Sequence, residues 1–383
     1  MNLDAAIEQF KLLMQEQLDR VNHLKKEVDW VKFNEKKYIV IGICGGDGIG
    51  PAITNQAQRI LEHVLKEKIQ EKKNIINLIE GLTIENRAAK NKAIPTDVLH
   101  QLKKCDVILK GPTTTPQKGD GWPNIESANV VMRRELDLFA CVRPIKVPEK
   151  SIDWIFFREN TEGAYALGSR GFSIGDDLSV DFKVITQQGS ERIIRMAFEY
   201  AKHNNRKRVT IVTKSNVVKT TDGRFSDVAK KIAHEYSNHG ISCDEWYIDI
   251  MTAKLLDNRR AAEFDVMVLP NLYGDILTDE AGQIQGGVGT AGSSNIGKQY
   301  AMFEAVHGSA PRMVEEKRDI FADPSSMIKA ASMLLNHIGY HNISSKIDLA
   351  LDSLASNEEC KITGHADGLT GSEFTDKLIN RLD

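Results

Sequence analysis

Short apolar runs alternate with amphipathic stretches along most of this chain, and glycine, proline or charged residues separate them. Apolar runs of strand length occupy 38–44, 106–110, 154–160, 208–213, 245–249 and 266–269. Apolar residues with helical spacing occupy about 52–66, 95–104, 191–203, 222–236 and 324–337. Strands that alternate with helices in this way predict an α/β fold with a parallel sheet.

Residues 1 to about 33 show a heptad pattern of their own. Two core positions recur, one with Ile7, Met14, Val21 and Val28 and the other with Leu3, Phe10, Leu24 and Val31. The pattern predicts one amphipathic helix. Such a helix either lies on its own domain or docks on a partner subunit, and neither arrangement implies chemistry.

The stretch 271–280 combines a strand end with an acidic helix. If the segment after Gly274 is helical, Asp275 and Asp279 lie one turn apart, with Cβ atoms only about 5–6 Å from each other. Such carboxylates repel unless a cation lies between them, and Mg²⁺ or Mn²⁺ suits oxygen ligands. The alternative is a solvated acidic helix start that the helix dipole stabilises. The glycine-rich residues 285–292 favour the metal site, because they permit close backbone approach.

Further polar residues follow predicted strands, where α/β proteins place ligands. The glycines at 45, 46, 48 and 50 do not have the G-x-G-x-x-G spacing. Three threonines follow the strand at 106–110, and Lys219 and Asp249 each follow a later strand. Arginine forks match carboxylates, so a substrate with several carboxylates is one interpretation of the polar set Ser127, Asn129, Arg133, Arg143 and Arg158. The other interpretation is that the arginines form surface ion pairs with Glu135 and Glu159.

Composition narrows the class of protein. A chain of 383 residues is long enough for two domains. The net charge of −3 and the pI near 6.4 lack a basic signature, so we expect no nucleic-acid partner. The five cysteines lack paired spacing, no apolar run reaches the roughly 18 residues of a membrane span, and the N-terminus lacks a signal core. We therefore expect a reduced, cytoplasmic protein without membrane contact.

Five short motifs in order resemble those of one enzyme family. They lie at 46–51, 110–116, 157–162, 271–275 and 307–311. Together they resemble the β-decarboxylating dehydrogenases, the isocitrate/isopropylmalate dehydrogenase family, over residues 38 to 380. The resemblance implies a homodimer with a non-Rossmann α/β fold. It also implies a helical extension at 1–35, a large cofactor-binding domain at 36–138 and 287–383, and a small domain at 139–286 with a dimer clasp at about 163–188.

The resemblance also assigns site residues. It implies that Ser127, Asn129, Arg133, Arg143 and Arg158 hold the carboxylates of the substrate. Tyr165 and Lys219 would move protons, and Asp275 and Asp279 would bind Mg²⁺ or Mn²⁺ together with Asp249 of the partner subunit. The cofactor would be bound by Thr115, His307, Gly308, Ser309, Ala310, Arg312 and Asp323.

The resemblance favours isocitrate as substrate, with 2-oxoglutarate and CO₂ as products. Ser127 and Asn129 stand where isopropylmalate enzymes carry leucines, and an unpaired buried polar group costs about 1–3 kcal/mol. Homoisocitrate, 3-isopropylmalate, another 2-hydroxy acid and a non-catalytic regulatory subunit are the alternatives. Arg312 favours NADP because it suits a 2′-phosphate, and NAD stays open. Ala52 and Asp323 depart from the family pattern, which has a glutamate and an asparagine there.

Overall fold

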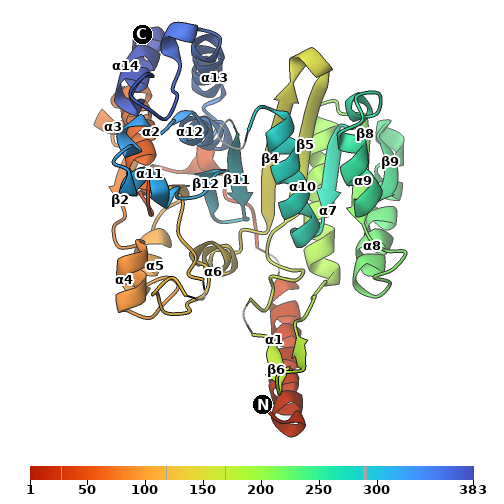
Figure 1. Ribbon diagram of the computed structural model, residues 1–383. Coiled ribbons are helices and arrows are strands. Elements are labelled where there is room, and N and C mark those ends of the chain that lie inside the picture. The colour runs from red at the N-terminus through yellow and green to blue at the C-terminus, as the bar shows by residue number, and fades with distance from the viewer. Residues whose placement is uncertain (27, 118, 169, 288–290) are drawn as a thin grey trace. The chain divides into compact units, whose positions relative to one another are not determined.

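A computed structural model describes the chain from residue 1 to residue 383, apart from 27, 118, 169 and 288–290 (Figure 1). Residues 288–290 belong to the predicted glycine-rich segment and lie outside the described residues. The chain divides into two compact units, one of residues 1–29 and 139–285 and the other of residues 30–138 and 286–383. The roles of the predicted large domain, small domain and clasp stay predictions.

The unit of residues 30–138 and 286–383 contains a five-stranded mixed sheet in the order β2-β1-β3-β12-β11. All neighbouring strands are parallel except β11 and β12. Its strands are β1 (Ile39–Cys44), β2 (Asn74–Leu78), β3 (Val107–Lys110), β11 (Gly292–Ile296) and β12 (Ala301–Ala305). Its helices are α2 (Gly50–Val64), α3 (Lys66–Gln70), α4 (Ile84–Ala89), α5 (Thr96–Leu102), α6 (Ala128–Glu135), α11 (Pro311–Glu315), α12 (Ser325–His337), α13 (His341–Ala355) and α14 (Gly371–Leu382).

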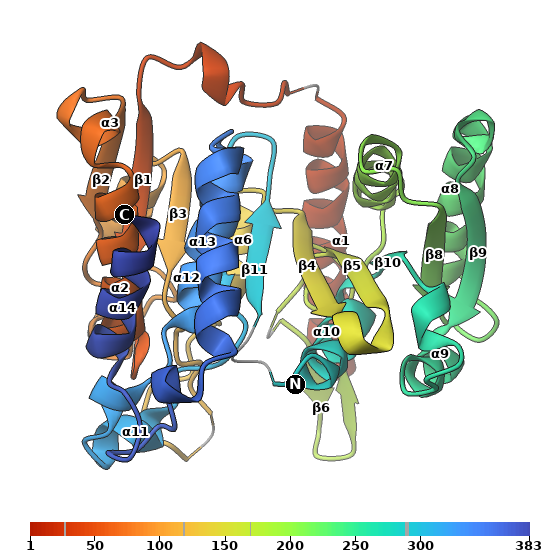
Figure 2. The same ribbon diagram turned by 90° about the horizontal axis from the view of Figure 1, so that it is seen from above.

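Helices cover this sheet and bury its side chains. Helices α2, α12, α13 and α14 gather together, and α12 packs on β11 and β12 (Figure 2). Another cluster joins α5 and α6 to strands β1, β3 and β12 through Leu102, Met132, Cys44, Ile108 and Met302. This packing fixes α6, which carries Asn129 and Arg133, and the ends of β3 and β12, which precede the predicted cofactor residues Thr115 and His307.

The unit of residues 1–29 and 139–285 contains a second five-stranded arrangement in the order β4-β5-β10-β8-β9. Strands β5, β10, β8 and β9 are parallel, whereas β4 is antiparallel to β5. Its strands are β4 (Ala140–Val147), β5 (Ile152–Glu159), β8 (Arg208–Thr213), β9 (Ser242–Tyr247) and β10 (Val266–Leu269), with a separate hairpin of β6 (Phe172–Ile174) and β7 (Leu178–Val180). Its helices are α1 (Leu3–Leu24), α7 (Gln187–His203), α8 (Thr221–Glu235), α9 (Ile248–Leu255) and α10 (Asn271–Ile284).

The predicted α/β class is confirmed. The strand pairs β4–β5 and β11–β12, however, are antiparallel and not parallel as predicted. Only residues 148–151 connect β4 to β5, and Ser151 has a left-handed conformation with φ of 54°. Only residues 297–300 connect β11 to β12. A parallel pair needs a crossover of a dozen or more residues, so both short connections produce antiparallel pairs.

Two predicted boundaries were wrong. Strand β9 ends at Tyr247, opposite the last residue of β8, so Asp249 lies in the first turn of α9 and not in the strand. A strand continues only while its neighbour offers hydrogen bonds. Helix α10 begins at Asn271, directly after Pro270, and not after Gly274. Asp323 lies just before α12, where its carboxylate accepts a hydrogen bond from the backbone N–H of Ser325 at 2.8 Å.

Helix α1 ends at Leu24, nine residues before the end of the heptad pattern. It packs on its own unit through Ala6 and Leu13, beside β6 (Figure 1). The predicted core residues Leu3 and Ile7 are instead 62% and 53% exposed. No described helix is long and apolar enough to cross a membrane.

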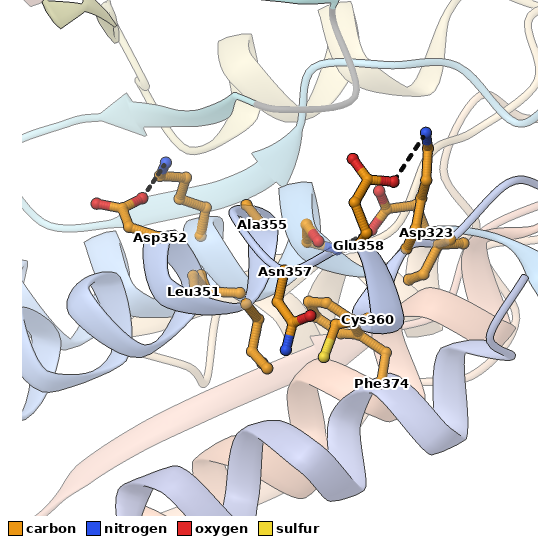
Figure 3. Close-up of a pocket in the computed structure, with 13 residues that line it drawn as sticks. Asp323, Leu351, Asp352, Ala355, Asn357, Glu358, Cys360 and Phe374 are labelled. Atoms are coloured by element: carbon orange, nitrogen blue, oxygen red, sulfur yellow. Dashed lines mark hydrogen bonds and ion pairs between the residues drawn. The ribbon is translucent and has the colours of Figure 1, made fainter.

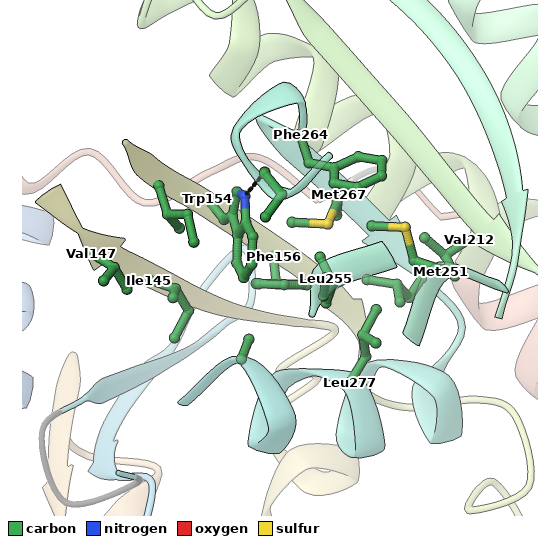
Figure 4. Close-up of a cluster of buried hydrophobic side chains, with 14 residues drawn as sticks. Ile145, Val147, Trp154, Phe156, Val212, Met251, Leu255, Phe264, Met267 and Leu277 are labelled. Atoms are coloured by element: carbon green, nitrogen blue, oxygen red, sulfur yellow. Dashed lines mark hydrogen bonds between the residues drawn. The ribbon is translucent and has the colours of Figure 1, made fainter. Parts of the chain in front are cut away.

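A buried core holds α10 in place in this unit (Figure 4). Leu277 and Ala281 of α10 join a cluster with Trp154 and Phe156 of β5 and Met267 of β10. The Trp154 indole N–H also donates to the Ala261 carbonyl at 2.8 Å. Leu277 lies two residues after Asp275, about 200° around the helix. The core therefore directs Asp275 and Asp279 away from the apolar interior.

Candidate active site

Arg158 and Asp275 form the centre of a polar cluster at the carboxyl ends of β5 and β10. Arg158 is 1% exposed, and its Nη1 donates to Asp275 Oδ1 at 2.5 Å. Asn271 orients the guanidinium, because its Oδ1 accepts from Nε at 3.1 Å and from Nη2 at 2.7 Å. The Tyr165 hydroxyl donates to Asp275 Oδ2 at 2.9 Å. Arg158, Tyr165 and Asp275, predicted from separate motifs, are thus brought together.

Gly274 makes the close approach of Arg158 to α10 possible. A Cβ atom at this position would lie 2.5 Å from Arg158 Cγ and 2.7 Å from Arg158 Cβ. These atoms belong to the inner part of a buried side chain, which cannot move aside easily. A glycine in a helix interior costs about 0.5–1 kcal/mol relative to alanine, so its presence reflects this contact.

Arg143 contacts Asp279 in the way that Arg158 contacts Asp275. Its Nη1 donates to Asp279 Oδ1 at 2.9 Å and to Thr278 Oγ1 at 2.5 Å. The side chain of Arg143 is 8% exposed and that of Asp279 is 60% exposed. The two carboxylates of α10 therefore each have a guanidinium on the inner side. Within a single chain, arginine side chains therefore supply the positive charge that two such closely spaced carboxylates require.

The donor set at Asp275 and Asp279 also fits a hard divalent cation. Both side chains reach solvent, at 35% and 60% exposure, and Mg²⁺ and Mn²⁺ prefer carboxylate and water oxygens. Within the residues that the structure describes, no group of three or more His, Cys, Asp or Glu side chains could hold a metal. One chain thus offers a pair of carboxylates, and the third ligand expected from Asp249 of the partner subunit stays a prediction.

Lys219 and Asp249 are not placed in this cluster by the single chain. Lys219 is exposed in the connection between β8 and α8. Asp249 is exposed at the start of α9, where the Lys214 ammonium lies 2.7 Å from its Oδ1. The hydrogen bond from Lys214 lowers the pKa of the Asp249 carboxyl. Both side chains are exposed in the single chain.

Helix α6 carries three predicted substrate residues in the other unit. Ser127 is the residue before its first turn, and Asn129 accepts a hydrogen bond from Thr113 Oγ1 at 3.0 Å. Arg133 is 8% exposed, and its Nη2 lies 3.4 Å from Glu304 Oε1. The Arg133 Nε is buried without a hydrogen-bond partner among the described residues. A buried N–H without a partner is costly, so this donor is suited to a ligand that supplies an acceptor.

Glu304 links Arg133 to a buried lysine. The Lys110 ammonium, which is fully buried at the end of β3, lies 3.3 Å from Glu304 Oε2 and donates to the Gly111 carbonyl at 2.9 Å. Asn295 donates to Glu304 Oε1 at 2.8 Å. Burial lowers the pKa of Lys110, and the Glu304 carboxylate acts in the opposite direction. One carboxylate thus serves two buried cations.

Three family motifs meet around the glycine-rich turn after β1. The Asp47 carboxylate accepts from the backbone N–H groups of Ile84 at 2.6 Å and Thr114 at 2.7 Å. The Thr114 and Ser309 hydroxyls are 3.0 Å apart. Gly48 has φ of 59°, and a Cβ there would lie 1.9 Å from the Ser309 carbonyl oxygen. Burial raises the pKa of Asp47, although both N–H groups and Arg87 oppose it.

The remaining predicted cofactor residues lie in the segments that follow β3 and β12. Thr115 and Gly308 are exposed, and His307, next to Gly308, is half-buried. Ala310 has a left-handed conformation with φ of 43° and precedes the short helix α11. Arg312 in α11 is 84% exposed, and its Nε lies 2.6 Å from Glu316 Oε1.

Asp323 lines a cavity of about 260 Å³ between α12, α13 and α14 (Figure 3). Two ion pairs border it, Lys329 with Asp352 at 3.8 Å and Lys361 with Glu358 at 3.6 Å. None of the other predicted cofactor residues lines this cavity. Asp323 lines this cavity and Arg312 does not, and their assignment to one cofactor stays a prediction.

Sequence reasoning missed the residues that hold the predicted ones in place. Asn271, Thr278 and Glu304 lie inside or beside the quoted motifs but had no assigned role. An acidic residue inside the apolar run 301–305 was a usable signal for Glu304, because a buried carboxylate needs cations. No local signal pairs Asn271 with Arg158, since 113 residues separate them.

Comparison with known proteins agrees with this arrangement. A family model described as isocitrate/isopropylmalate dehydrogenase matches residues 40–378. The chain is 37% identical over 358 residues to "Isocitrate dehydrogenase [NADP]" of Rickettsia bellii, covering 90% of this chain and 70% of that protein. It is 36% identical to "Isocitrate dehydrogenase [NAD] subunit 2, mitochondrial" of Saccharomyces cerevisiae, covering 90% of both chains.

A solved structure shows the same fold. The crystal structure of isocitrate dehydrogenase from Methylococcus capsulatus superposes with a TM-score of 0.78 at 31% identity. The match covers 90% of this chain and 99% of that one.

Proposed function

Because this chain belongs to the isocitrate/isopropylmalate dehydrogenase family, we propose that it catalyses the oxidative decarboxylation of isocitrate to 2-oxoglutarate and CO₂. The observation that carries the proposal is the cluster of Arg158, Tyr165 and Asp275. It joins a carboxylate-binding cation, a proton donor and a hard metal ligand within hydrogen-bond distance. A metal-assisted reaction of a hydroxy acid that carries carboxylates uses all three.

Two groups from solution would complete the chemistry. When bound, a nicotinamide would supply a hydride acceptor for C2 of the substrate, and a divalent cation would supply Lewis-acid stabilisation of negative charge on the C2 oxygen. Asp275 and Asp279, with Asp249 of the partner subunit, would hold Mg²⁺ or Mn²⁺. The cofactor would lie along Thr115 and the segment 307–312, near the turn where Asp47, Thr114 and Ser309 meet.

The residues of the chain would then bind the substrate and move its protons. Arg143 and Arg158 would share their guanidinium donors between the α10 carboxylates and the substrate carboxylates. Lys219 would take the proton of the C2 hydroxyl, and the Tyr165 hydroxyl, now bound to Asp275, would protonate the enol carbon. For this role the Tyr165 hydroxyl would have to turn from Asp275 Oδ2, its acceptor in this structure, toward the substrate.

Polar residues of α6 support isocitrate over an isopropyl substrate. The Asn129 carbonyl oxygen is occupied by Thr113, which leaves its amide nitrogen to donate to a third carboxylate. The buried Nε of Arg133 likewise lacks an acceptor among the described residues. An isopropyl group would leave both donors unpaired, at about 1–3 kcal/mol each.

The direct test is an assay of the purified protein with Mn²⁺ and either NAD or NADP. We expect reduced nicotinamide to form with isocitrate and at least about tenfold less efficiently with homoisocitrate or 3-isopropylmalate. A protein that turns over only 3-isopropylmalate would contradict the proposal. A protein that is inactive until a second chain is added would instead be a regulatory subunit, an alternative that the "subunit 2" relative keeps open.

We propose NADP as the preferred cofactor, supported by Arg312. Arg312→Asp should lower kcat/KM for NADP by about 10- to 100-fold and change kcat/KM for NAD much less. The reason is that a charge-assisted contact to the 2′-phosphate contributes about 1.5–3 kcal/mol. Steady-state kinetics with both cofactors check this, with Lys317→Gln as the control for loss of a nearby exposed charge. Equal losses with the two cofactors would refute the assignment.

We also propose a cytoplasmic homodimer or larger homo-oligomer to which α1 contributes. All five cysteines are free thiols, four of them buried, as expected for a reducing compartment. Leu3 and Ile7 are exposed apolar side chains of α1, and so is Leu18, which is 59% exposed. Combined Leu3→Glu and Ile7→Glu substitutions should reduce the molar mass in light scattering, because like charges would face a partner helix. An unchanged mass would show that α1 serves only its own subunit.

A further inference from the structure

Helix α1 lies outside the residues that match the family model, which begin at residue 40, yet its own unit holds it firmly. The rings of Phe10 and Phe182 lie 5.5 Å apart. Polar contacts follow the whole length of the helix. In order, and from donor to acceptor, they are the Met1 amine to the Ser173 carbonyl at 2.9 Å, Gln9 to the Arg170 carbonyl at 3.1 Å, Arg170 to Glu16 at 2.6 and 2.8 Å, and Arg20 to Glu162 at 3.0 Å.

Arg20 differs from the other contacts because it reaches a buried group. Its Nη1 donates to Glu162 Oε1 at 3.0 Å and its Nη2 to Thr161 Oγ1 at 3.3 Å. The Glu162 side chain is fully buried and that of Arg20 is 23% exposed. The Glu16 and Arg170 side chains are about half exposed, so that pair stays in solvent.

Glu162 is one of two buried carboxylates beside Arg158. Glu159 is 1% exposed and accepts from the Thr161 hydroxyl at 2.7 Å and the Glu162 N–H at 2.7 Å. Glu162 also accepts from the N–H and hydroxyl of Thr186, at 2.8 and 2.5 Å. Burial, with the neighbouring charge of Glu162, raises the pKa of Glu159 to about 7, and Arg192 of α7 opposes this. Arg192 and Arg20 are the cations that face this pair of carboxylates from the packed helices.

A continuous path of hydrogen bonds joins Glu162 to the candidate active site. The Glu162 carbonyl accepts from Asn271 Nδ2 at 3.0 Å. The Asn271 side-chain oxygen accepts from Arg158, and Arg158 donates to Asp275. A shift of the Glu162 backbone would therefore alter the orientation of Asn271, and with it the position of the Arg158 guanidinium.

We propose that Arg20 is a positioning residue for the active site, and that α1 acts as a strut that fixes Glu162 and, through Asn271, orients Arg158 toward substrate and Asp275. The inference rests on the proposed function, because it assigns Arg158 to a substrate carboxylate. It gives the N-terminal helix a role within its own subunit, in addition to any contact with a partner. Without the guanidinium, Glu162 loses the charged donor of α1 and keeps the neutral N–H and hydroxyl of Thr186 in a buried place, so its segment would move toward solvent.

The test is steady-state kinetics on the full-length protein with Arg20→Gln. We expect KM for isocitrate and the Mn²⁺ concentration for half activation to rise about fivefold or more, with kcat changed less than about twofold. Arg20→Lys should restore part of the loss, because lysine supplies the charge for Glu162 but cannot also reach Thr161. Glu16→Gln is the matched control, since it removes the exposed ion pair of the same helix and should leave both constants unchanged.

A purely structural role predicts a different result. In that case Arg20→Gln would lower the melting temperature and the active fraction while KM stays at the wild-type value, and the inference would be overturned. In the double variant with Glu162→Gln the increase in KM should be smaller than the product of the two single effects, because both charges are gone. Independent effects that multiply would also overturn it.

These results separate the inference from the proposed function. A wild-type protein without turnover of isocitrate contradicts the proposed function itself. An active wild type with unchanged KM in Arg20→Gln contradicts only the role of Arg20. Hydrogen exchange offers a readout that needs no turnover, and we expect faster exchange at 158–162 and 271–275 in Arg20→Gln than in Glu16→Gln.

Discussion

Asp275→Asn is expected to lower kcat/KM for isocitrate by at least about 1,000-fold. Asp275 contacts both Arg158 and Tyr165 and is the proposed metal ligand with the most buried surroundings. A divalent cation that polarises the substrate contributes several kcal/mol, and each 1.36 kcal/mol is a tenfold change in rate. Asparagine keeps the shape and one acceptor oxygen but removes the charge that binds the metal.

Metal binding measured directly distinguishes this cause from a folding defect. Mn²⁺ affinity by calorimetry or spin resonance should fall at least about tenfold in Asp275→Asn at a temperature where the variant is folded. The melting temperature without metal should fall as well, because the buried Arg158 guanidinium loses its carboxylate partner. Asp227→Asn, an exposed acidic position on α8, is the control and should leave both rate and affinity unchanged. Full activity with normal Mn²⁺ affinity in Asp275→Asn would remove Asp275 from the metal site.

The elements around this site could be predicted because each follows from a local pattern. Val266–Leu269 is apolar throughout and became the fully buried β10, and Asp275 and Asp279 lie in one helix as their spacing required. The order of five motifs identified the family, which the comparison confirms. Periodicity and motif order are properties of neighbouring residues, so the sequence alone was enough for them.

The partners of the charged residues could not be predicted in the same way. The arginines were assigned to substrate carboxylates, yet Arg143 and Arg158 in this chain bind the aspartates of α10. Such pairs join residues more than 100 positions apart, and only the packing of β4, β5 and α10 decides which carboxylate meets which guanidinium. The heptad pattern of α1 predicted the helix but not its buried face, since the buried residues Ala6 and Leu13 each lie one position before a predicted core residue.

The buried group of Lys110, Arg133 and Glu304 leads to the second large effect. Glu304→Gln is expected to lower the free energy of unfolding by about 3–5 kcal/mol at pH 7, because removal of one partner leaves a buried charge without compensation. Lys110 is fully buried, and the side chains of Arg133 and Glu304 are 9% and 8% exposed. Glutamine would keep an acceptor for Asn295 but no negative charge for either cation. Chemical denaturation with urea measures the difference.

The loss should depend on pH in a direction that the pKa of Lys110 determines. Burial already lowers that pKa from the usual 10.5, and Glu304 is the main group that holds it up, so the variant lowers it further. Between the folded and unfolded pKa values the unfolded state binds more protons, and stability therefore rises with pH. The deficit of Glu304→Gln should shrink from pH 7 toward pH 10, as Lys110 loses its proton in the folded variant. Glu135→Gln, which breaks the exposed pair with Lys103, is the control and should cost less than about 1 kcal/mol at every pH. A similarly small, pH-independent loss in Glu304→Gln would show that the buried Lys110 does not depend on the Glu304 carboxylate.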